Sequence, residues 1–193
     1  MSELPDALQR LIDREGIRDA LYRYARGIDR LDVELFRTVF WEDGGFEDGI
    51  VEGTARDFIP SLIGDTVRNT FAATQHFISN IRIDFDAPGT ASTECYFLAH
   101  HQLNPGEALL NALLGPRRMI EMGGDYSRPH ELTIAGRYLD RFEKRGDEWR
   151  ILKRRFVCEW TSCSPDSGLG REGFAQVMKL WGSRDQNDPS YRQ

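Results

Sequence analysis

Two side chains that can move a proton stand in recognisable local patterns. Asp29 closes the run Tyr-Ala-Arg-Gly-Ile-Asp, and His76 lies in the run Thr-Gln-His-Phe-Ile-Ser-Asn. Histidine titrates near neutral pH, and a neighbouring buried carboxylate fixes its tautomer and stabilises the imidazolium. Together they would form a device that removes a proton from carbon. The alternative is that His76 is a structural hydrogen-bonding residue of a strand.

A helical lead-in must position Asp29. Apolar residues recur at helical spacing over residues 5–28, and Gly16 is expected to divide this stretch into two helices. Asp29 falls four residues after Ala25, which places it at the edge of the buried stripe and at a helix end.

Further short elements follow Asp29. Asp32 is expected to cap a third helix that reaches Phe40, with the sequence Glu-Asp-Gly-Gly ending it and an extended piece at 46–52. Thr54 is suited to cap one more helix, which Pro60 makes short or irregular.

The rest of the chain has the composition of β-strands joined by turns. The expected strands are 74–85, 91–103, 131–143 and 149–160. Their short connections predict an antiparallel meander, and helices that precede strands indicate an α+β domain with a strongly bent sheet. The Gly- and Pro-rich insertion 104–130 is interpreted as a flap over a pocket.

Composition excludes several classes of function. The chain has 193 residues, which fits one domain, and 31 acidic against 25 basic side chains give a net charge of -6. That field repels phosphate backbones, so no nucleic-acid partner is expected. No apolar run is long enough for a membrane span. Three cysteines without Cys-x-x-Cys spacing and a polar N-terminus indicate a reducing, cytoplasmic setting.

No cofactor or metal is expected. The run Gly168-Leu169-Gly170 lacks the strand and helix of a dinucleotide fingerprint. His100 and His101 are neighbours on a strand and point to opposite faces, so they are poorly placed to share one ion.

Three stretches together resemble a known family. They are Leu-Tyr-Arg-Tyr-Ala-Arg-Gly-Ile-Asp-Arg-Leu-Asp, the run around His76, and the closing Gly-Arg-Tyr-Leu-Asp-Arg-Phe-Glu-Lys with Glu-Trp-Arg-Ile-Leu-Lys-Arg. They resemble the SnoaL-like branch of the nuclear transport factor 2-like superfamily, over residues 5–162. The resemblance implies a cone-shaped domain with N-terminal helices packed into a curved, mostly antiparallel sheet. Residues 163–193 would be a C-terminal extension, helical in spacing, that docks on the sheet or on a neighbouring subunit.

Within this family the chain resembles the scytalone dehydratases and the hexachlorocyclohexane dehydrochlorinases. The resemblance implies that Asp29 supports His76 in elimination and that Arg154 lies near the reacting group. Arg154 also shares strand parity with an apolar face, so it either faces a pocket or pairs with a core carboxylate such as Asp29. His101, by parity with Phe97, is the better match to a second histidine. Gly136 and Tyr138 stand where a dehydratase holds substrate with other residues.

Other residues are expected to shape the pocket. Tyr22 and Tyr24 precede Asp29 and could polarise a carbonyl or assist a leaving oxygen, although packing is the commoner role. Apolar walls are expected from Trp41, Phe40, Phe71 and Ile78.

The sequence therefore predicts a cofactor-independent lyase, a dehydratase or related β-elimination enzyme, that acts on a small apolar cyclic molecule. One alternative is a polyketide-type cyclase or ring isomerase with the same dyad, and another is a non-catalytic ligand-binding or oxygenase-associated subunit. A homo-oligomer, trimer or dimer, is expected through outward apolar strand residues: Phe77, Ile81, Ile83 and Phe85.

Overall fold

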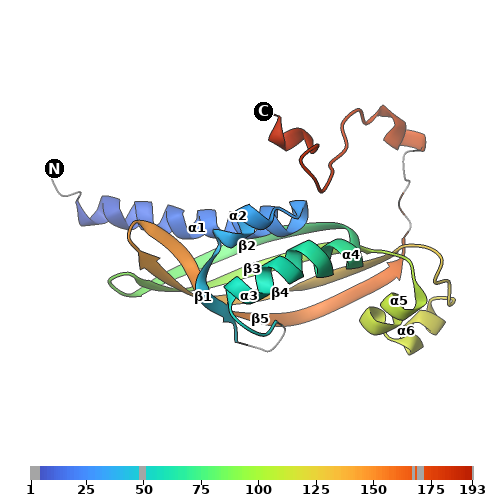
Figure 1. The fold of residues 1–193 in the computed structure, drawn as a ribbon, viewed down its shortest axis with the longest axis horizontal. Helices are drawn as coiled ribbons and strands as arrows, with labels where there is room; N and C mark the ends of the chain where they lie inside the picture. Colours follow the sequence, from blue (N-terminus) through green and yellow to red (C-terminus); the bar gives the residue numbers. More distant parts are fainter. Residues whose placement is uncertain (1–4, 48–50, 167, 169–171, 193) are drawn as a thin grey trace.

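In the computed structural model, which describes residues 5–47, 51–166, 168 and 172–192, helices cover one face of a curved sheet (Figure 1). The described strands form one sheet in the order β1-β5-β4-β3-β2. Its strands are β1 (Phe40–Phe46), β2 (Phe71–Ala87), β3 (Thr90–Leu103), β4 (His130–Arg145) and β5 (Glu148–Pro165). β1 pairs with β5 in parallel, and the other neighbours pair antiparallel. The predicted α+β class and antiparallel meander are confirmed.

The helices differ from their predicted bounds. They are α1 (Asp6–Arg30), α2 (Val33–Arg37), α3 (Ala55–Ser61), a π-helix (Leu62–Val67), α4 (Arg68–Thr70), α5 (Glu107–Leu114) and α6 (Pro116–Glu121). Gly16 does not divide α1, so that prediction was wrong. A Cβ at Gly16 would lie 3.2 Å from the Trp149 ring, so this glycine serves a close approach of helix and strand.

The helix expected to reach Phe40 ends at Arg37, and the chain enters β1 instead. The predicted stop signal, Gly44 and Gly45, lies inside this strand. A Cβ on either glycine would come within 2.8 Å of a backbone oxygen of a neighbouring segment, so the pair allows close packing rather than ending a helix. Of the predicted extended piece 46–52, residues 48–50 lie outside the described chain.

The irregular helix predicted from Pro60 is present. Pro60 lies inside α3 and cannot donate a backbone hydrogen bond, and the chain continues as a π-helix from Leu62.

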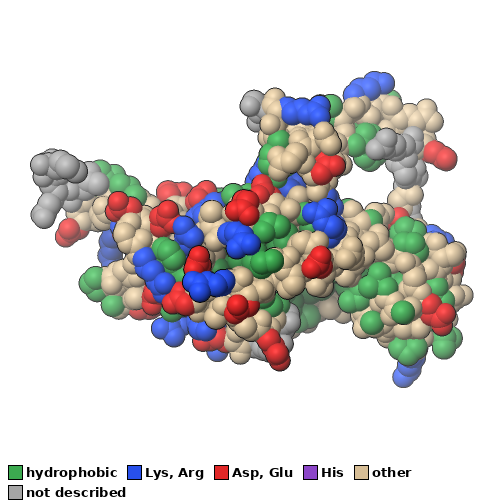
Figure 2. Space-filling view, in the orientation of Figure 1, with side chains coloured by type: hydrophobic (Ala, Val, Ile, Leu, Met, Phe, Trp, Pro, Cys, Tyr) green, Lys and Arg blue, Asp and Glu red, His purple; other side chains and the backbone are tan. Residues whose placement is uncertain are grey.

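The main core lies between the helices and the inner face of the sheet, where Tyr24, Phe36, Phe40 and Tyr138 are buried. None of the described helices combines the length and hydropathy needed to cross a membrane. Basic and acidic side chains are interspersed over the face seen in Figure 2.

The insertion 104–130 does not form the expected flap over a pocket. Its helices α5 and α6 lie at the end of the sheet (Figure 1), where Leu110 and Met119 pack with Leu103 in a separate small cluster.

The outward face of β2 also differs from the prediction. Of the expected outward residues only Phe77 is exposed, at 52%, whereas Ile83 is 4% exposed and Ile81 and Phe85 pack against the core. The β2–β3 register shifts between Ser79 and Arg82, and Asn80 has φ 50°. This irregularity reverses which face the later residues occupy.

The C-terminal segment is only partly helical. A 3₁₀-helix spans Gly173–Val177 and a second spans Pro189–Tyr191, and the apolar residues Phe174, Leu180 and Trp181 are exposed rather than docked on the sheet. Leu169 and Gly170 of the Gly-x-Gly run lie outside the described residues.

Candidate active site

Asp29 and His76 meet where the end of α1 crosses the start of β2. Asp29 Oδ1 lies 2.7 Å from His76 Nδ1, and Asp29 Oδ2 accepts the backbone N–H of His76 at 2.8 Å. Thr74 Oγ1 donates to Asp29 Oδ1 at 2.8 Å. Thr74 was missed by the sequence reasoning, although a hydroxyl two residues before His76 must share its strand face.

The local contacts decide the charge of this carboxylate. Burial alone would raise the pKa of Asp29, but the hydrogen bonds and positive charge of His76, together with Thr74, lower it below its ordinary value. An ionised carboxylate only accepts hydrogen bonds, so His76 Nδ1 carries a proton, and in the neutral ring the lone pair is then on Nε2. His76 is thereby held in the tautomer of a general base.

His76 lines a small cavity between the helices and the sheet. The cavity has a volume of about 150 Å³, the size at which an engineered apolar cavity holds benzene. Its walls are Tyr24, Ile28, Phe46, Val51, Leu62, His76, Phe97, Ala99, His101, Ile134, Tyr138 and Phe156. Among the described residues of the wall, only two imidazoles and two phenols interrupt an otherwise apolar surface.

His101 is the second imidazole of the cavity, and His100 is not part of the wall. The two histidine rings are 5.5 Å apart between centroids, and His101 Nδ1 lies 3.2 Å from the carbonyl oxygen of Leu132. Burial, with a smaller effect of His76, lowers the pKa of His101 to about 4. A neutral ring whose Nδ1–H is given to a carbonyl has no second proton to donate.

Tyr24 and Tyr138 supply the phenols. Their rings are 5.4 Å apart, and the Tyr24 ring meets the His76 ring edge-on at 6.2 Å. Burial raises the pKa of Tyr138 well above its usual value, so its hydroxyl stays protonated and can donate.

Arg154 lies behind these phenols rather than in the cavity wall, so of its two expected positions it takes the pairing with a core carboxylate and not the pocket-facing one. Its guanidinium carbon lies 4.1 Å from the Tyr24 ring centroid and 4.0 Å from that of Tyr138. Nε and Nη2 donate to the two oxygens of Asp140, each at 2.7 Å. The core carboxylate is therefore Asp140, which faces Arg154 in the β4–β5 register, and not Asp29.

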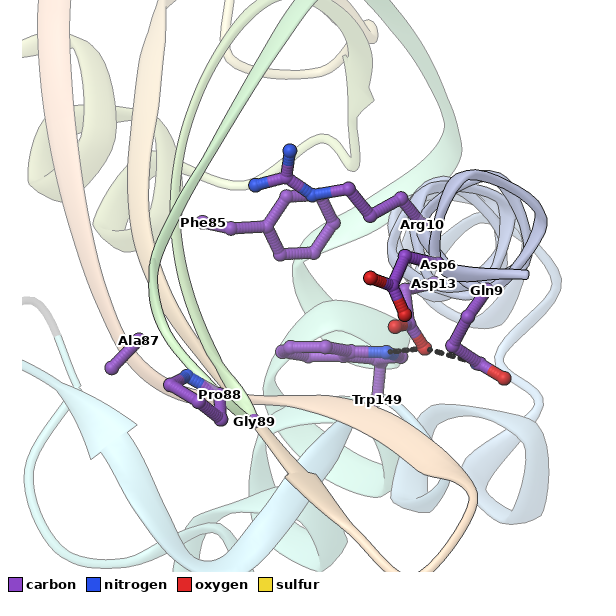
Figure 3. Close-up of a pocket in the computed structure, with 9 residues that line it drawn as sticks. All are labelled: Asp6, Gln9, Arg10, Asp13, Phe85, Ala87, Pro88, Gly89 and Trp149. Atoms are coloured by element: carbon purple, nitrogen blue, oxygen red, sulfur yellow. Dashed lines mark hydrogen bonds between the residues drawn. The ribbon is translucent and has the colours of Figure 1, made fainter. Parts of the chain in front are cut away.

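A larger hollow lies elsewhere, between the start of α1 and the β2–β3 turn (Figure 3). Its volume is about 530 Å³, and no imidazole lines it. Its Asp13 carboxylate already accepts from Lys144 and Trp149, each at 2.8 Å. Because its carboxylates, Asp6 and Asp13, have no imidazole beside them, the smaller cavity at His76 is the better candidate for acid/base chemistry.

The model of the SnoaL-like domain family matches residues 9–155 of this chain. The chain belongs to the SnoaL-like family. Its fold is that of the nuclear transport factor 2-like superfamily.

Individual relatives of this SnoaL-like chain are distant. It is 30% identical to the terrestric acid biosynthesis cluster protein E of Penicillium crustosum over 108 residues, 53% of this chain and 67% of the relative. The hexachlorocyclohexane dehydrochlorinase LinA-type3 of Novosphingobium barchaimii has a TM-score of 0.65 at 18% identity, with 85% of this chain and 97% of that one covered. A scytalone dehydratase-like protein of Novosphingobium aromaticivorans has a TM-score of 0.63 at 20% identity, with 86% and 99% covered. These structural likenesses concern the fold.

Five side chains that were predicted to shape the pocket of the SnoaL-like chain do not line the cavity: Tyr22, Phe40, Trp41, Phe71 and Ile78. Tyr22 is 53% exposed, because residues two apart on a helix do not share a face and Tyr24 takes the inner one. Trp41 donates its indole N–H to the Glu143 carbonyl at 3.0 Å and lies outside the cavity, since its neighbour Phe40 takes the core side of β1. Ile78 packs against the core without reaching the cavity wall.

The described residues contain no group of three or more His, Cys, Asp or Glu side chains placed to hold a metal ion.

Proposed function

We propose that this SnoaL-like protein is a cofactor-independent lyase, a dehydratase or related β-elimination enzyme, that acts on a small, largely apolar cyclic molecule. The observation that carries this proposal is the 2.7 Å contact between Asp29 Oδ1 and His76 Nδ1 beside an apolar cavity. The contact leaves Nε2 of a cavity-lining imidazole as the proton acceptor.

In the proposed step, His76 Nε2 takes a proton from a carbon of the substrate. The electrons of the broken C–H bond form a C=C bond, and the bond to the leaving group on the next carbon breaks with its electron pair. Asp29 stabilises the imidazolium so formed. The proton later leaves His76 for the departing group or for water.

The phenols are proposed to assist the departing group. Neutral His101 has no proton to give, whereas Tyr24 and Tyr138 carry hydroxyl protons in a site with few other polar groups, where preorganised donors act strongly. Arg154 is a positioning residue in this account, because its guanidinium contacts both phenol rings and does not line the cavity.

The walls and the relatives support the substrate class. Aliphatic and aromatic side chains make up most of the lining, and the volume of about 150 Å³ matches a single ring. The names of the structural relatives include a dehydrochlorinase and a dehydratase, which are eliminating enzymes.

A cyclase or ring isomerase with the same pair is the alternative, because the same base could serve it, and the name of the biosynthesis cluster protein states no reaction. Mass analysis of the product separates the two. Elimination releases water or halide, whereas isomerisation and cyclisation by proton transfer conserve mass.

Substitution of His76 tests whether this residue is the base. Hydroxylated and halogenated cyclic compounds are screened with the wild-type protein and with His76→Ala and Asp29→Asn. General-base catalysis contributes about 10²- to 10⁴-fold, so we expect turnover to fall by that order in His76→Ala. The turnover of Asp29→Asn is expected to fall as well, because a neutral amide cannot stabilise the imidazolium as a carboxylate does.

Tyr22→Phe is the matched control, since it changes an exposed side chain of the same helix. Equal turnover by the wild type and His76→Ala, at unchanged melting temperatures, would contradict the proposal. Absence of turnover together with recovery of a larger iron-dependent partner would favour a non-catalytic subunit instead.

A further inference from the structure

The C-terminal segment returns from the end of β5 to the helical face of the molecule (Figure 1). Residues 183–191 form a compact loop there, built around the carboxylate of Asp188, which is 4% exposed. Asp188 accepts the backbone N–H of Ser183 at 2.8 Å and that of Ser190 at 3.0 Å. The loop is therefore internally ordered by a carboxylate that bridges both of its ends.

Side chains of α1 and of Asp32, the residue before α2, hold this loop in place. Arg26 donates to Ser190 Oγ at 3.1 Å and stacks on the Tyr191 ring at 4.9 Å. The Tyr191 hydroxyl donates to Asp32 Oδ2 at 2.8 Å, and Arg30 contacts Asp188 at 3.8 Å. These contacts anchor the loop at the C-terminal end of α1, next to Asp29.

Arg184 projects from the anchored loop onto the backbone of the candidate site. Its Nε donates to the carbonyl oxygen of Asp29 at 3.2 Å, and its Nη1 donates to that of Phe71 at 2.6 Å. The Asp29 carbonyl is among the last of α1, where helix carbonyls lack helical partners and the helix dipole favours a cation. Phe71 is the first residue of β2, the strand that carries His76.

We propose that Arg184 is a positioning residue of the acid/base pair, which clips the end of α1 to the start of β2. This inference rests on the proposed function for its catalytic meaning. One guanidinium bonds to the residue that supplies the carboxylate and to the strand that supplies the imidazole. Small displacements of catalytic groups are costly, so a fixed distance between these two segments has a direct chemical use.

The surroundings of Arg184 support a specific role. Burial lowers the pKa of its guanidinium, and its Nη2 is a buried donor without a hydrogen-bond partner among the described residues. Holding a partly buried cation with one donor unused is unfavourable. An arginine that only packed the loop could keep its guanidinium in solvent instead of this partly buried position.

The test reads the dyad directly and needs no substrate. In full-length protein labelled with ¹⁵N-histidine, NMR follows the His76 Nδ1–H proton, assigned by its loss in His76→Gln, and measures its exchange with water. We expect Arg184→Gln to exchange this proton at least about tenfold faster, the effect of losing a hydrogen bond to a charged group. Arg184→Lys keeps the charge and should lie between Arg184→Gln and the wild type.

Arg192→Gln is the matched control, because it makes the same chemical change in the same segment, and its Nη2 bonds to Asn187 rather than to the site. Equal exchange in Arg184→Gln and Arg192→Gln would overturn the proposal, as would a wild type without a protected His76 Nδ1–H. If Arg184→Gln does not fold, Asp188→Asn loosens the loop with Arg184 retained. Faster exchange is again expected there, and unchanged exchange would overturn the proposal.

The two proposals fail separately in these experiments. Unchanged turnover in His76→Ala would contradict the proposed lyase function, whereas the effect of Arg184 on the exchange of the His76 proton could still be observed. Loss of turnover in His76→Ala, with proton exchange unchanged in Arg184→Gln, would contradict only the proposed positioning role of Arg184.

Discussion

His101 and Asp29 are both buried close to His76, and burial disfavours the charged form of each, yet they differ in charge. Asp29 receives enough hydrogen bonds to stay charged despite burial, whereas His101 has one carbonyl partner and stays neutral. The difference is physical: each added donor stabilises a carboxylate, while a lone acceptor does not balance the desolvation of an imidazolium. The site thus separates a charged residue that supports the base from a neutral residue that shapes the wall.

This separation predicts how stability depends on pH at the residue scale. The folded pKa of His101 is about 4, against about 6.5 in an unfolded chain. Between these values the unfolded state binds more protons, so the free energy of unfolding falls as pH decreases through this window. The shift corresponds to about 3 kcal/mol when the window has been crossed.

His101→Gln should remove this part of the pH dependence. Urea unfolding at pH values from about 4 to 7 measures it, and the difference between wild type and variant isolates His101 from the carboxylates. His100→Gln, at the neighbouring position outside the cavity wall, is the control. If the free energy of unfolding changed with pH in the same way for the wild type and His101→Gln, the prediction would be contradicted.

Among the elements, the β4–β5 hairpin forms one side of the cavity. It carries Tyr138 and Phe156 in the wall and pairs Asp140 with Arg154 behind it. Its register shifts between Ala135 and Gly136. Irregularities of this kind bend strands and increase their twist, which a sheet needs in order to wrap around a ligand site.

Gly136 is the residue on which this bend depends. A Cβ there would lie 2.0 Å from the Val157 carbonyl oxygen and 3.0 Å from Phe97 Cε1. We therefore expect Gly136→Ala to lower the free energy of unfolding by about 3 kcal/mol, because the backbone of β5 must move. Gly64→Ala is the matched control, since nothing lies within 4 Å of its Cβ position. Similar denaturation midpoints for the two variants would show that the hairpin adapts without cost.

At the scale of the whole molecule, the outer face of the sheet carries an apolar row across four strands. Leu98 on β3 pairs with Phe77 on β2 and with Ala135 on β4, and Ala135 pairs with Trp160 on β5. Phe77, Leu98 and Trp160 are 52%, 40% and 50% exposed. Ala135 between them is only 8% exposed, so the row consists of three exposed apolar side chains around a buried alanine. Exposed apolar side chains gathered in this way are typical of a surface that is covered in an assembly.

We propose that a second copy of the chain covers this row, in a dimer or a trimer. Leu98→Lys at the centre of the row is expected to shift the protein to a monomer, because a lysine ammonium would be buried without a partner. Leu113→Lys, which changes a leucine that is 41% exposed on α5, is expected to leave the assembly unchanged. Light scattering at micromolar concentration measures both, and a monomeric wild type would rule out the assembly.

Local patterns in the sequence were enough for several features. They identified Asp29 at a helix end and His76 in a strand, they located the four long strands, and strand alternation placed His101 rather than His100 in the cavity. These features depend on helix and strand periodicity and on family motifs, which are encoded by residues close together in the chain.

Tertiary structure decided the features that depend on contacts between distant segments. The partner of Arg154 is set by the β4–β5 register, the outward face of β2 is reversed at Asn80, and Arg184 reaches the backbone of Asp29. The alternation of side chains along a strand predicts which face of the sheet each one occupies only until a bulge or register shift reverses it. A folded loop can also bring a charged side chain to a site that is far away in the sequence. The sequence by itself therefore determined which side chains could exchange a proton, and only packing decided what surrounds, supports and encloses them.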